Sequence, residues 1–349
     1  MRRRREEGQV QETRLTPLLH HCCKRKARKV KAQDLILMSR LVGRFAYIAS
    51  VIGILLFILS GVGFGNELGA GDAAHFLRSG IGAGALGMGG AFVAVADDVS
   101  GGYWNPAGVV QTSSARLGGT SESRYGGLVS FQYLAGVFSS STMGLGLIWA
   151  HSDLYSVYLA SAAGRIGGLS LGANGKLYAF GVSGEHAQGI GLDAGVLYRL
   201  SVGEVELAFG LTSSDIGWSK IHWQATDYSA TDYVAWVNRV GAALEGSLSF
   251  GWWQCTADLE VALRRPPRQG ETDYLSTALQ TSLRFGAELR LEWFAVRAGL
   301  ADIGWEEGGG LSLRPTLGIG VQLEGVTFDA AWIPSQLGGT YLLSIEFQR

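Results

Sequence analysis

The chain has 349 residues, a formal net charge of −1, and 52 glycines but only 6 prolines. Glycine at about twice its usual ~7% share, without a proline excess, excludes collagen-like and proline-rich disordered classes. Residues 1–44 hold 13 of the 29 Lys and Arg, which leaves residues 66–349 with 16 basic and 26 acidic residues and a net charge of −10. Such an acidic body lacks the basic stripe that phosphate contacts need, so nucleic acid is not an expected partner.

The basic N-terminal region, residues 1–65, divides into two parts. Residues 1–37 are rich in Arg and Lys without apolar periodicity, which is unusual for the start of an exported protein. From Met38 the sequence has the three parts of a secretory signal peptide: basic residues, an apolar run at 45–60 and a small-x-small cleavage site at 63–65. We predict that 1–37 is a non-native extension from a mis-assigned start and that 38–65 is a signal peptide. A transmembrane anchor is the alternative, but it needs about 20 apolar residues.

A glycine-rich block follows at 81–110, with the sequence IGAGALGMGGAFVAVADDVSGGYWNPAGVV. Its glycines leave little side chain to pack and permit left-handed backbone, so the block suits a chain threaded through a tight space. Pro106 fixes its own φ and forces Asn105 to be extended, which predicts a rigid turn from which Asn105 can form hydrogen bonds. Asp97 and Asp98 are expected to cap the turn that follows them, and contact with a cation is the alternative.

The same block offers a rival interpretation, because Gly82 to Gly87 satisfies the dinucleotide-binding pattern G-x-G-x-x-G. That fingerprint needs a strand before it, a helix after it and an acidic residue about 20 positions further on. Gly101, Gly102 and Pro106 are expected to interrupt any helix there. We therefore rank a nucleotide site far below a role that uses the block as a compact, threaded segment.

After the block, apolar and polar residues alternate with a period of two, which is typical of strands with one apolar face. Ile190, Leu192 and Tyr198 share one face, for example, while Asp193 and Arg199 share the other. A soluble sandwich alternates too, but export and strand number favour a closed barrel with its apolar face toward lipid and its polar face toward the lumen. The fourteen predicted strands are 116–122, 126–138, 143–151, 154–163, 168–181, 189–200, 204–213, 233–248, 252–265, 277–290, 292–303, 313–324, 326–334 and 340–349.

The connections between these strands are expected to differ at the two ends of the barrel. Short turns on one side and long loops on the other are what an outer-membrane barrel with a periplasmic N-terminus shows. The connections after even-numbered strands are short. The long loops predicted after odd-numbered strands are 182–188, 214–232, 266–276 and 304–312.

Three aromatic residues mark the longest of these loops, namely Trp218, Trp223 and Tyr228. A large apolar ring with a polar edge can either capture a hydrophobic molecule or sit at the surface of a membrane. They are therefore candidates for a ligand-capture surface, with an interfacial aromatic belt as the alternative.

No catalytic residue, metal site or cofactor is predicted. Gly168 to Gly172 fits the G-x-S-x-G pattern, but Ser170 lies inside an alternating run and not at a strand-to-helix turn. The six His residues show no spacing typical of metal ligands, and Cys255 is the lone cysteine of the body. We therefore do not expect an enzyme.

Three sub-motifs of the block occur together, GMGGA at 87–91, VADD at 95–98 and WNPAG at 104–108. In this combination the block resembles the N-terminal signature of the FadL/TodX-type outer-membrane transport proteins and of their PorV/PorQ-like relatives. One departure from the family pattern is Gly84, where relatives tend to carry Arg. The resemblance implies an all-β fold, a transmembrane antiparallel β-barrel of about 14 strands at 114–349, with an N-terminal hatch at 66–113 inside its lumen. The hatch-motif residues that it implies are Gly87, Met88, Gly89, Gly90, Asn105, Pro106 and Ala107.

The resemblance also implies a function, which is passive transport in the bacterial outer membrane. A hydrophobic, fatty-acid-like molecule would be captured outside, pass an apolar pocket beside the hatch and leave sideways through the wall into the bilayer. The expected partners are outer-membrane lipid, this hydrophobic small-molecule ligand, and the barrel-assembly machinery during insertion. The alternative is a PorV/PorQ-like protein that shuttles or anchors secreted proteins at the cell surface.

Overall fold

The computed structural model describes residues 74–111, 114–182, 184–224, 229–249, 251–268, 270–271, 273–305, 311–335 and 338–349. The predicted N-terminal extension, the signal peptide and the first part of the predicted hatch, 66–73, lie outside the described residues. The described part of the chain falls within one compact unit, Val62–Arg349. In that part, no helix has the length and apolar character needed to cross a bilayer.

Fourteen antiparallel strands form a closed ring, because the first strand pairs both with the second and with the last. This confirms the predicted all-β barrel and its strand number, and the predicted bounds agree to within a few residues. In ring order the strands are β1 (Ala115–Arg124), β2 (Val129–Ser139), β3 (Met143–Ser152), β4 (Tyr155–Ile166), β5 (Leu169–Val182), β6 (Glu185–Val202), β7 (Val205–Ser214), β10 (Trp236–Leu248), β11 (Gly251–Leu263), β12 (Leu279–Leu291), β13 (Phe294–Trp305), β14 (Leu311–Leu323), β15 (Val326–Ile333) and β16 (Thr340–Gln348).

The ring has an apolar exterior. On β6, Ile190 and Leu192 are 73% and 65% exposed, whereas Asp193 is 3% exposed and faces the lumen. Large apolar side chains are exposed in the same way around the ring, from Leu117 on β1 to Phe347 on β16. Such a surface is unfavourable in water and favourable in lipid, and closure leaves no strand edge unpaired in the bilayer. The chain is therefore a membrane-spanning barrel, and its place is the bacterial outer membrane.

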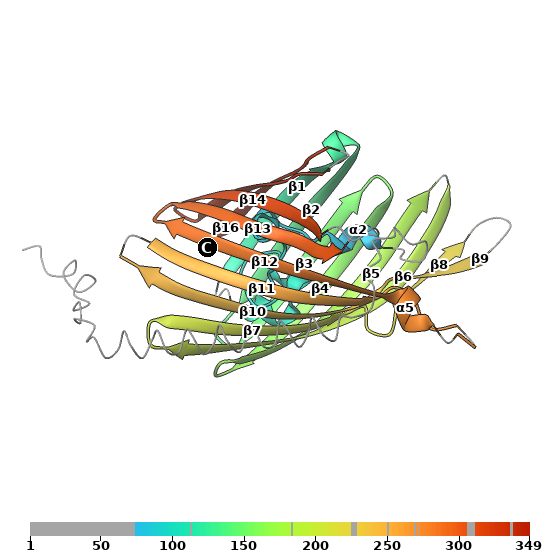
Figure 1. Cartoon of the computed structure of the whole chain (residues 1–349), viewed down its shortest axis with the longest axis horizontal. Helices are drawn as coiled ribbons and strands as arrows, with labels where there is room; N and C mark the ends of the chain where they lie inside the picture. The colour runs from blue at the N-terminus through green and yellow to red at the C-terminus, as the bar shows by residue number, and fades with distance from the viewer. Residues whose placement is uncertain are drawn as a thin grey trace, which may run out of the picture. The chain divides into compact units, whose positions relative to one another are not determined.

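The two ends of the ring differ in their connections (Figure 1). Near the C-terminus the turns are short, as between β10 and β11 or between β14 and β15. The opposite end carries η2 (Tyr125–Gly127), a hairpin of β8 (Lys220–Gln224) and β9 (Ser229–Tyr233), and the short helix α5 (Tyr274–Ala278). Because outer-membrane barrels have short periplasmic turns, we name the first the periplasmic end and the second the outer end.

One of the predicted long loops was wrong, and a second is a long connection with strands of its own. The loop predicted at 182–188 is a tight turn, because β5 runs to Val182 and β6 begins at Glu185. The polar residues at 185–188 continue the ladder with β5, so their composition was misleading. The loop predicted at 214–232 contains the β8–β9 hairpin, and β8 pairs with the outer end of β6.

Residues 74–111, named here the N-terminal segment, lie inside the ring (Figure 1). They contain α2 (His75–Arg78), α3 (Ala83–Gly87), α4 (Gly101–Trp104) and the 3-10 helix η1 (Pro106–Val110). The segment contacts inward-facing residues of strands all round the ring, from β1 through β3, β5, β7, β11 and β14 to β16.

The helix α4 was not expected, because Gly101 and Gly102 were predicted to interrupt a helix. It has only four residues and ends at Asn105, whose φ of −154° and ψ of 112° are extended. This is the conformation that the following Pro106 favours. The helix after the G-x-G-x-x-G pattern, α3, has five residues, so the block provides no long helix of the kind that a dinucleotide site uses.

Candidate functional site: the N-terminal segment and the lumen

Asn105 joins two parts of the N-terminal segment to the barrel wall. Its side chain is fully buried, and its Nδ2 donates to the carbonyl oxygens of Val93, at 2.9 Å, and of Val196 on β6, at 3.0 Å. Its Oδ1 accepts from the N–H of Ala107 at 3.1 Å, which holds the turn through Pro106. The bridge to the wall that the WNPAG motif predicts is therefore present, and its role in a hatch stays a prediction.

The GMGGA motif packs against β12, β13 and β14. The N–H of Gly89 donates to Oγ1 of Thr316 at 2.9 Å, and the same hydroxyl donates to the carbonyl oxygen of Gly87 at 3.0 Å. Met88 is 1% exposed. Gly89 and Gly90 have φ values of +69° and +72°, a left-handed backbone that favours glycine.

Glycines on the inner face of the wall let the segment approach closely. A Cβ built on Gly210 of β7 would lie 2.3 Å from the carbonyl oxygen of Val93, which is far inside van der Waals contact. Glycine at such a point is what a close approach between two backbones requires. The wall glycines that meet the segment in this way, named here the glycine girdle, are Gly118, Gly144, Gly172, Gly195, Gly210, Gly286, Gly299 and Gly318. The girdle accounts for part of the high glycine content of the chain.

Asp98 caps its turn as predicted, since its Oδ1 accepts from the N–H of Ser100 at 2.8 Å and from Oγ of Ser100 at 2.6 Å. Burial raises the pKa of the Asp98 carboxyl to about 7, and the nearby carboxylate of Glu346 on β16 acts in the same direction. The hydrogen bonds from Ser100 oppose this shift. Asp98 is therefore protonated more readily than an exposed aspartate.

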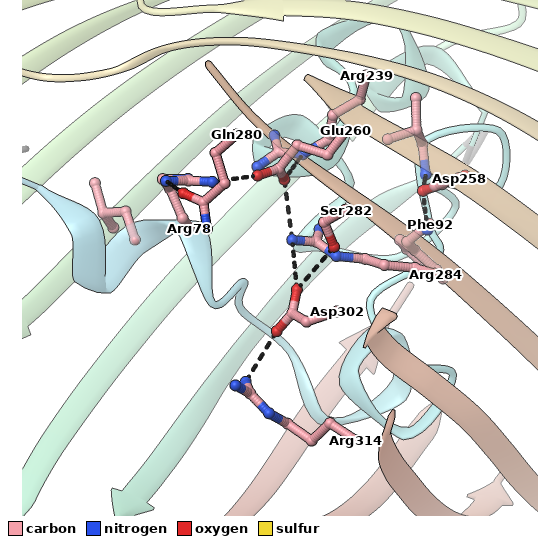
Figure 2. Close-up of polar contacts among 12 residues, drawn as sticks. Arg78, Phe92, Arg239, Asp258, Glu260, Gln280, Ser282, Arg284, Asp302 and Arg314 are labelled. Atoms are coloured by element: carbon pink, nitrogen blue, oxygen red, sulfur yellow. Dashed lines mark hydrogen bonds and ion pairs between the residues drawn. The ribbon is translucent and has the colours of Figure 1, made fainter. Parts of the chain in front are cut away.

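An ion network joins the segment to the outer half of the wall (Figure 2). The carboxylate of Glu260 on β11, 1% exposed, pairs with three guanidinium groups, Arg78 at 2.8 Å, Arg239 at 2.8 Å and Arg284 at 2.9 Å. Arg78 belongs to the segment, whereas Arg239 and Arg284 lie on β10 and β12. Removing one partner of such a buried group leaves an uncompensated charge, so the network fixes the position of Arg78.

Three further hydrogen bonds hold this side of the segment. Nη1 of Arg78 donates to Oε1 of Gln280 at 2.9 Å. The carboxylate of Asp258 accepts from the backbone N–H groups of Phe92 and Val93 at 2.7 and 2.9 Å. Figure 2 shows that Asp258, Glu260 and Gln280 reach the segment from the adjacent strands β11 and β12. No local sequence pattern marks these partners, because up to 202 residues separate them.

Beside this ion network, the outer half of the lumen holds an apolar cluster, which the alternating pattern does not reveal. Its buried members, named here the outer apolar cluster, are Ala74, Ile81, Phe131, Tyr133, Ala135, Ile148, Ala150, Val157, Leu159, Tyr178, Phe180, Ala187, Ile221 and Val234. Leu77, Tyr103, Tyr155 and Trp223 are partly buried and pack against it. A cavity of about 40 Å³ lies here beside α2, and its lining includes Leu77, Arg78, Leu159, Lys176 and Arg239.

Aromatic rings continue this cluster toward the outer end. Trp223 on β8 contacts Phe180 with ring centroids 6.1 Å apart, Phe180 contacts Tyr155 at 5.9 Å, and Tyr155 contacts Phe131 at 5.7 Å. Of the two capture candidates that the structure describes, Trp223 contacts the outer apolar cluster. Trp218 instead packs on Trp236, at 5.3 Å, and donates to the carbonyl oxygen of Leu263. Tyr228 lies outside the described residues.

The opposite, periplasmic half of the lumen is charged. A cavity of about 330 Å³ lies there, lined on one side by the segment and on the other by paired ions of the wall. Arg199 pairs with Glu245 at 3.1 Å, and Arg297 pairs with Glu288 at 2.6 Å. The segment therefore lies between the outer apolar cluster and a cavity that is mainly charged.

Two residues that the sequence analysis weighed for enzyme chemistry lie within strands. Ser170 lies within β5 and Cys255 within β11, as the sequence predicts for ordinary strand residues. Over the ranges that the structure describes, no three His, Cys, Asp or Glu side chains are grouped to hold a metal ion.

Comparisons with known proteins give structural neighbours only. No protein-family model matches the sequence, and no curated protein matches it either. The structure is similar to the monoaromatic hydrocarbon channel CymD, with a TM-score of 0.49, 14% identity, and coverage of 78% of this chain and 97% of that chain. It is also similar to the toluene transporter TodX of Pseudomonas putida (0.47, 11%, 77% and 98%) and to the outer membrane protein Omp33 of Acinetobacter baumannii (0.39, 11%, 68% and 98%).

CymD and TodX are FadL-type hydrocarbon channels, the family that the sequence resemblance names.

Proposed function

We propose that the chain is a passive outer-membrane channel for small hydrophobic, fatty-acid-like molecules, with the N-terminal segment as its hatch. The observation that carries the proposal is the outer apolar cluster, which lines the lumen where a water-filled porin would be polar. An apolar wall removes hydrophobic surface from water and offers little to a hydrophilic solute. A hydrophobic solute is therefore the one that gains from this lumen.

Entry begins at the outer end, where the aromatic rings from Trp223 to Phe131 lead toward α2. The cavity of about 40 Å³ beside α2 has room for a few water molecules at most, since one water needs a cavity of about 10–15 Å³. Binding of a larger ligand therefore displaces α2 or its neighbours. Gly80 and Gly82, with φ values of +94° and +89°, join α2 to the rest of the segment and supply the freedom for such a movement.

The charges at this cavity favour a ligand with one anionic group. Arg78 and Arg239 line it, and both share the single carboxylate of Glu260. A guanidinium has five N–H donors, so it can donate to a ligand carboxylate beside the partners that it already has. Lys176 also lines the cavity but already pairs with Asp193 and Asp215 at 2.8 Å each. The two arginines are therefore the candidates for binding a fatty-acid-like head group.

The exit follows from the contrast between the two halves of the lumen. Below the segment, a hydrophobic ligand would meet the charged cavity, whose ion pairs and water it would have to displace. Desolvating those polar groups without replacing their hydrogen bonds is costly. The free energy of the ligand is lower in the bilayer than in the charged cavity, so the ligand leaves sideways through the wall. A PorV/PorQ-like role with a secreted-protein partner stays a prediction of the resemblance.

The test is the initial rate of uptake of a fluorescent long-chain fatty acid by vesicles that contain the purified protein. Leu159→Gln places an amide in the outer apolar cluster, where Leu159 is 5% exposed. A hydrophobic ligand that passes this amide removes it from water at a cost of about 1–3 kcal/mol. Because this cost raises the barrier to passage, we expect the uptake rate to fall by about tenfold. Thr327→Val, in the charged cavity, is the matched control and keeps the wild-type rate. Wild-type rates for both variants, or a secreted protein copurifying in place of lipid, would overturn the proposal.

A further inference from the structure

The seam at which the barrel closes joins its first and last strands. β1 and β16 pair from Arg116 with Gln348 to Ser123 with Tyr341. Two side-chain contacts cross the seam inside the lumen. Oγ1 of Thr120 lies 2.7 Å from Oγ of Ser344, and Nη1 of Arg116 lies 2.8 Å from Oε1 of Glu346.

The same β16 side chains also hold the N-terminal segment. The N–H of Ala83 donates to Oγ of Ser344 at 2.9 Å, and the N–H of Val99 donates to Oε2 of Glu346 at 3.2 Å. On the other side of the seam, Nη1 of Arg116 on β1 donates to the carbonyl oxygen of Asp97 at 3.2 Å. Each polar pair across the seam is thus shared with the backbone of the segment.

Gly118 of β1 lies at the point where the three chains meet. A Cβ there would lie 2.6 Å from the carbonyl oxygen of Ile345 on β16 and 3.0 Å from Cγ2 of Val99 in the segment. The absence of a side chain lets β1, β16 and the segment pack together. The segment therefore covers the seam with close packing as well as with hydrogen bonds.

We propose that residues 83–99 are a staple that holds the β1–β16 seam closed, a role in barrel closure beyond that of a hatch. Every other neighbouring pair in the ring is consecutive in the chain, apart from the β8–β9 hairpin between β7 and β10, whereas Thr120 and Ser344 are 224 residues apart. Bringing the ends of so long a loop together costs conformational entropy. The segment immediately precedes β1, so it offers β16 two backbone donors next to β1. This inference stands whether or not the barrel transports hydrophobic molecules.

The test removes the staple from the segment side and leaves the wall unchanged. Ala83→Pro deletes the N–H group that donates to Oγ of Ser344. Ala83 is the first residue of α3, a position where proline is compatible with a helix. The ψ of Gly82, 127°, lies in the range found before proline, and its φ of +89° is open to glycine. In full-length protein, we expect amide hydrogen exchange on β1 and β16 to accelerate about 5- to 10-fold, the equivalent of one hydrogen bond, with β10 and β11 unchanged.

Thr316→Val is the matched control, because it deletes two hydrogen bonds between the segment and β14, away from the seam. Seam exchange that stays at the wild-type rate in Ala83→Pro, or that rises equally in the control, overturns the proposal.

A second variant keeps the test decisive if Ala83→Pro does not fold. Leu117 and Phe347 are partners in the seam register. Leu117→Cys with Phe347→Cys therefore closes the seam covalently, in a background where Cys22, Cys23 and Cys255 are replaced by Ser. Deleting residues 82–106 is expected to accelerate seam exchange without this disulfide and to leave it slow with the disulfide. Fast exchange at the closed seam, or slow exchange in the deletion alone, contradicts the staple.

Discussion

At the scale of residues, Asn105 is the most heavily used side chain of the predicted hatch motif. Asn105→Ala leaves the carbonyl oxygens of Val93 and Val196 without their donor in a buried place. We expect the free energy of unfolding in urea to fall by about 1–3 kcal/mol. Gln132→Ala is the control, because its hydrogen bond to Ser121 is exposed, and its effect is expected to be near zero. An equal, small effect of both substitutions would contradict the role of Asn105 as a buried bridge.

Asp98 gives the segment a dependence on pH. Its pKa rises from 3.8 to about 7 on folding, so the folded barrel binds this proton more tightly than the unfolded chain does. The associated stability is present at low pH and is lost as pH rises from 3.8 to about 7. Asp98→Asn replaces the titratable carboxyl group with an amide. The substitution is expected to flatten this part of the profile of unfolding free energy against pH. The facing carboxylates of Glu346 and Asp97 remain, and an unchanged slope in the variant would assign the dependence to them.

At the scale of elements, the glycine girdle makes the fit between segment and wall specific. Gly210→Ala puts a Cβ 2.3 Å from the carbonyl oxygen of Val93, so either β7 or the segment must shift. Overpacking of this kind costs about 1–3 kcal/mol in the free energy of unfolding. Gly175→Ala on β5 is the matched control, because a Cβ there meets nothing within 4 Å, and we expect no loss of stability. A loss in both variants would trace the effect to strand propensity and not to the segment.

The strands could be predicted because alternation with a period of two is local. What alternation could not show is the apolar inner face of β2, where Phe131 and Tyr133 face the lumen and Leu134 and Phe138 face lipid. With both faces apolar, nothing in the sequence distinguishes pocket from exterior. The pairing of Arg78 with Glu260 was missed for a different reason, since the partners are 182 residues apart and neither has a motif. The girdle did leave a signal, the repeated glycines on the polar face of the predicted strands.

At the scale of the whole molecule, a ring of fourteen strands encloses a lumen that wall side chains alone cannot fill. The segment fills it by touching strands on every side, and by separating the outer apolar cluster from the charged cavity. The GMGGA and WNPAG motifs could be recognised from sequence because each is a short local turn. Their contacts with Thr316 and Val196 could not, because register and closure of the ring decide which wall residues face them.

The same arrangement predicts what the barrel does without its segment. Deletion of Gly82 to Pro106 removes the close contacts with the glycine girdle but none of the fourteen strands, so the protein should still insert. With the seam held by the disulfide between positions 117 and 347, the ladder stays closed while the lumen is emptied. We therefore expect the deletion to conduct ions as an open pore in planar bilayers, whereas the full-length protein with the same disulfide stays closed. Equal single-channel conductance in the two would mean that the segment is no plug, and that wall side chains occlude the lumen by themselves.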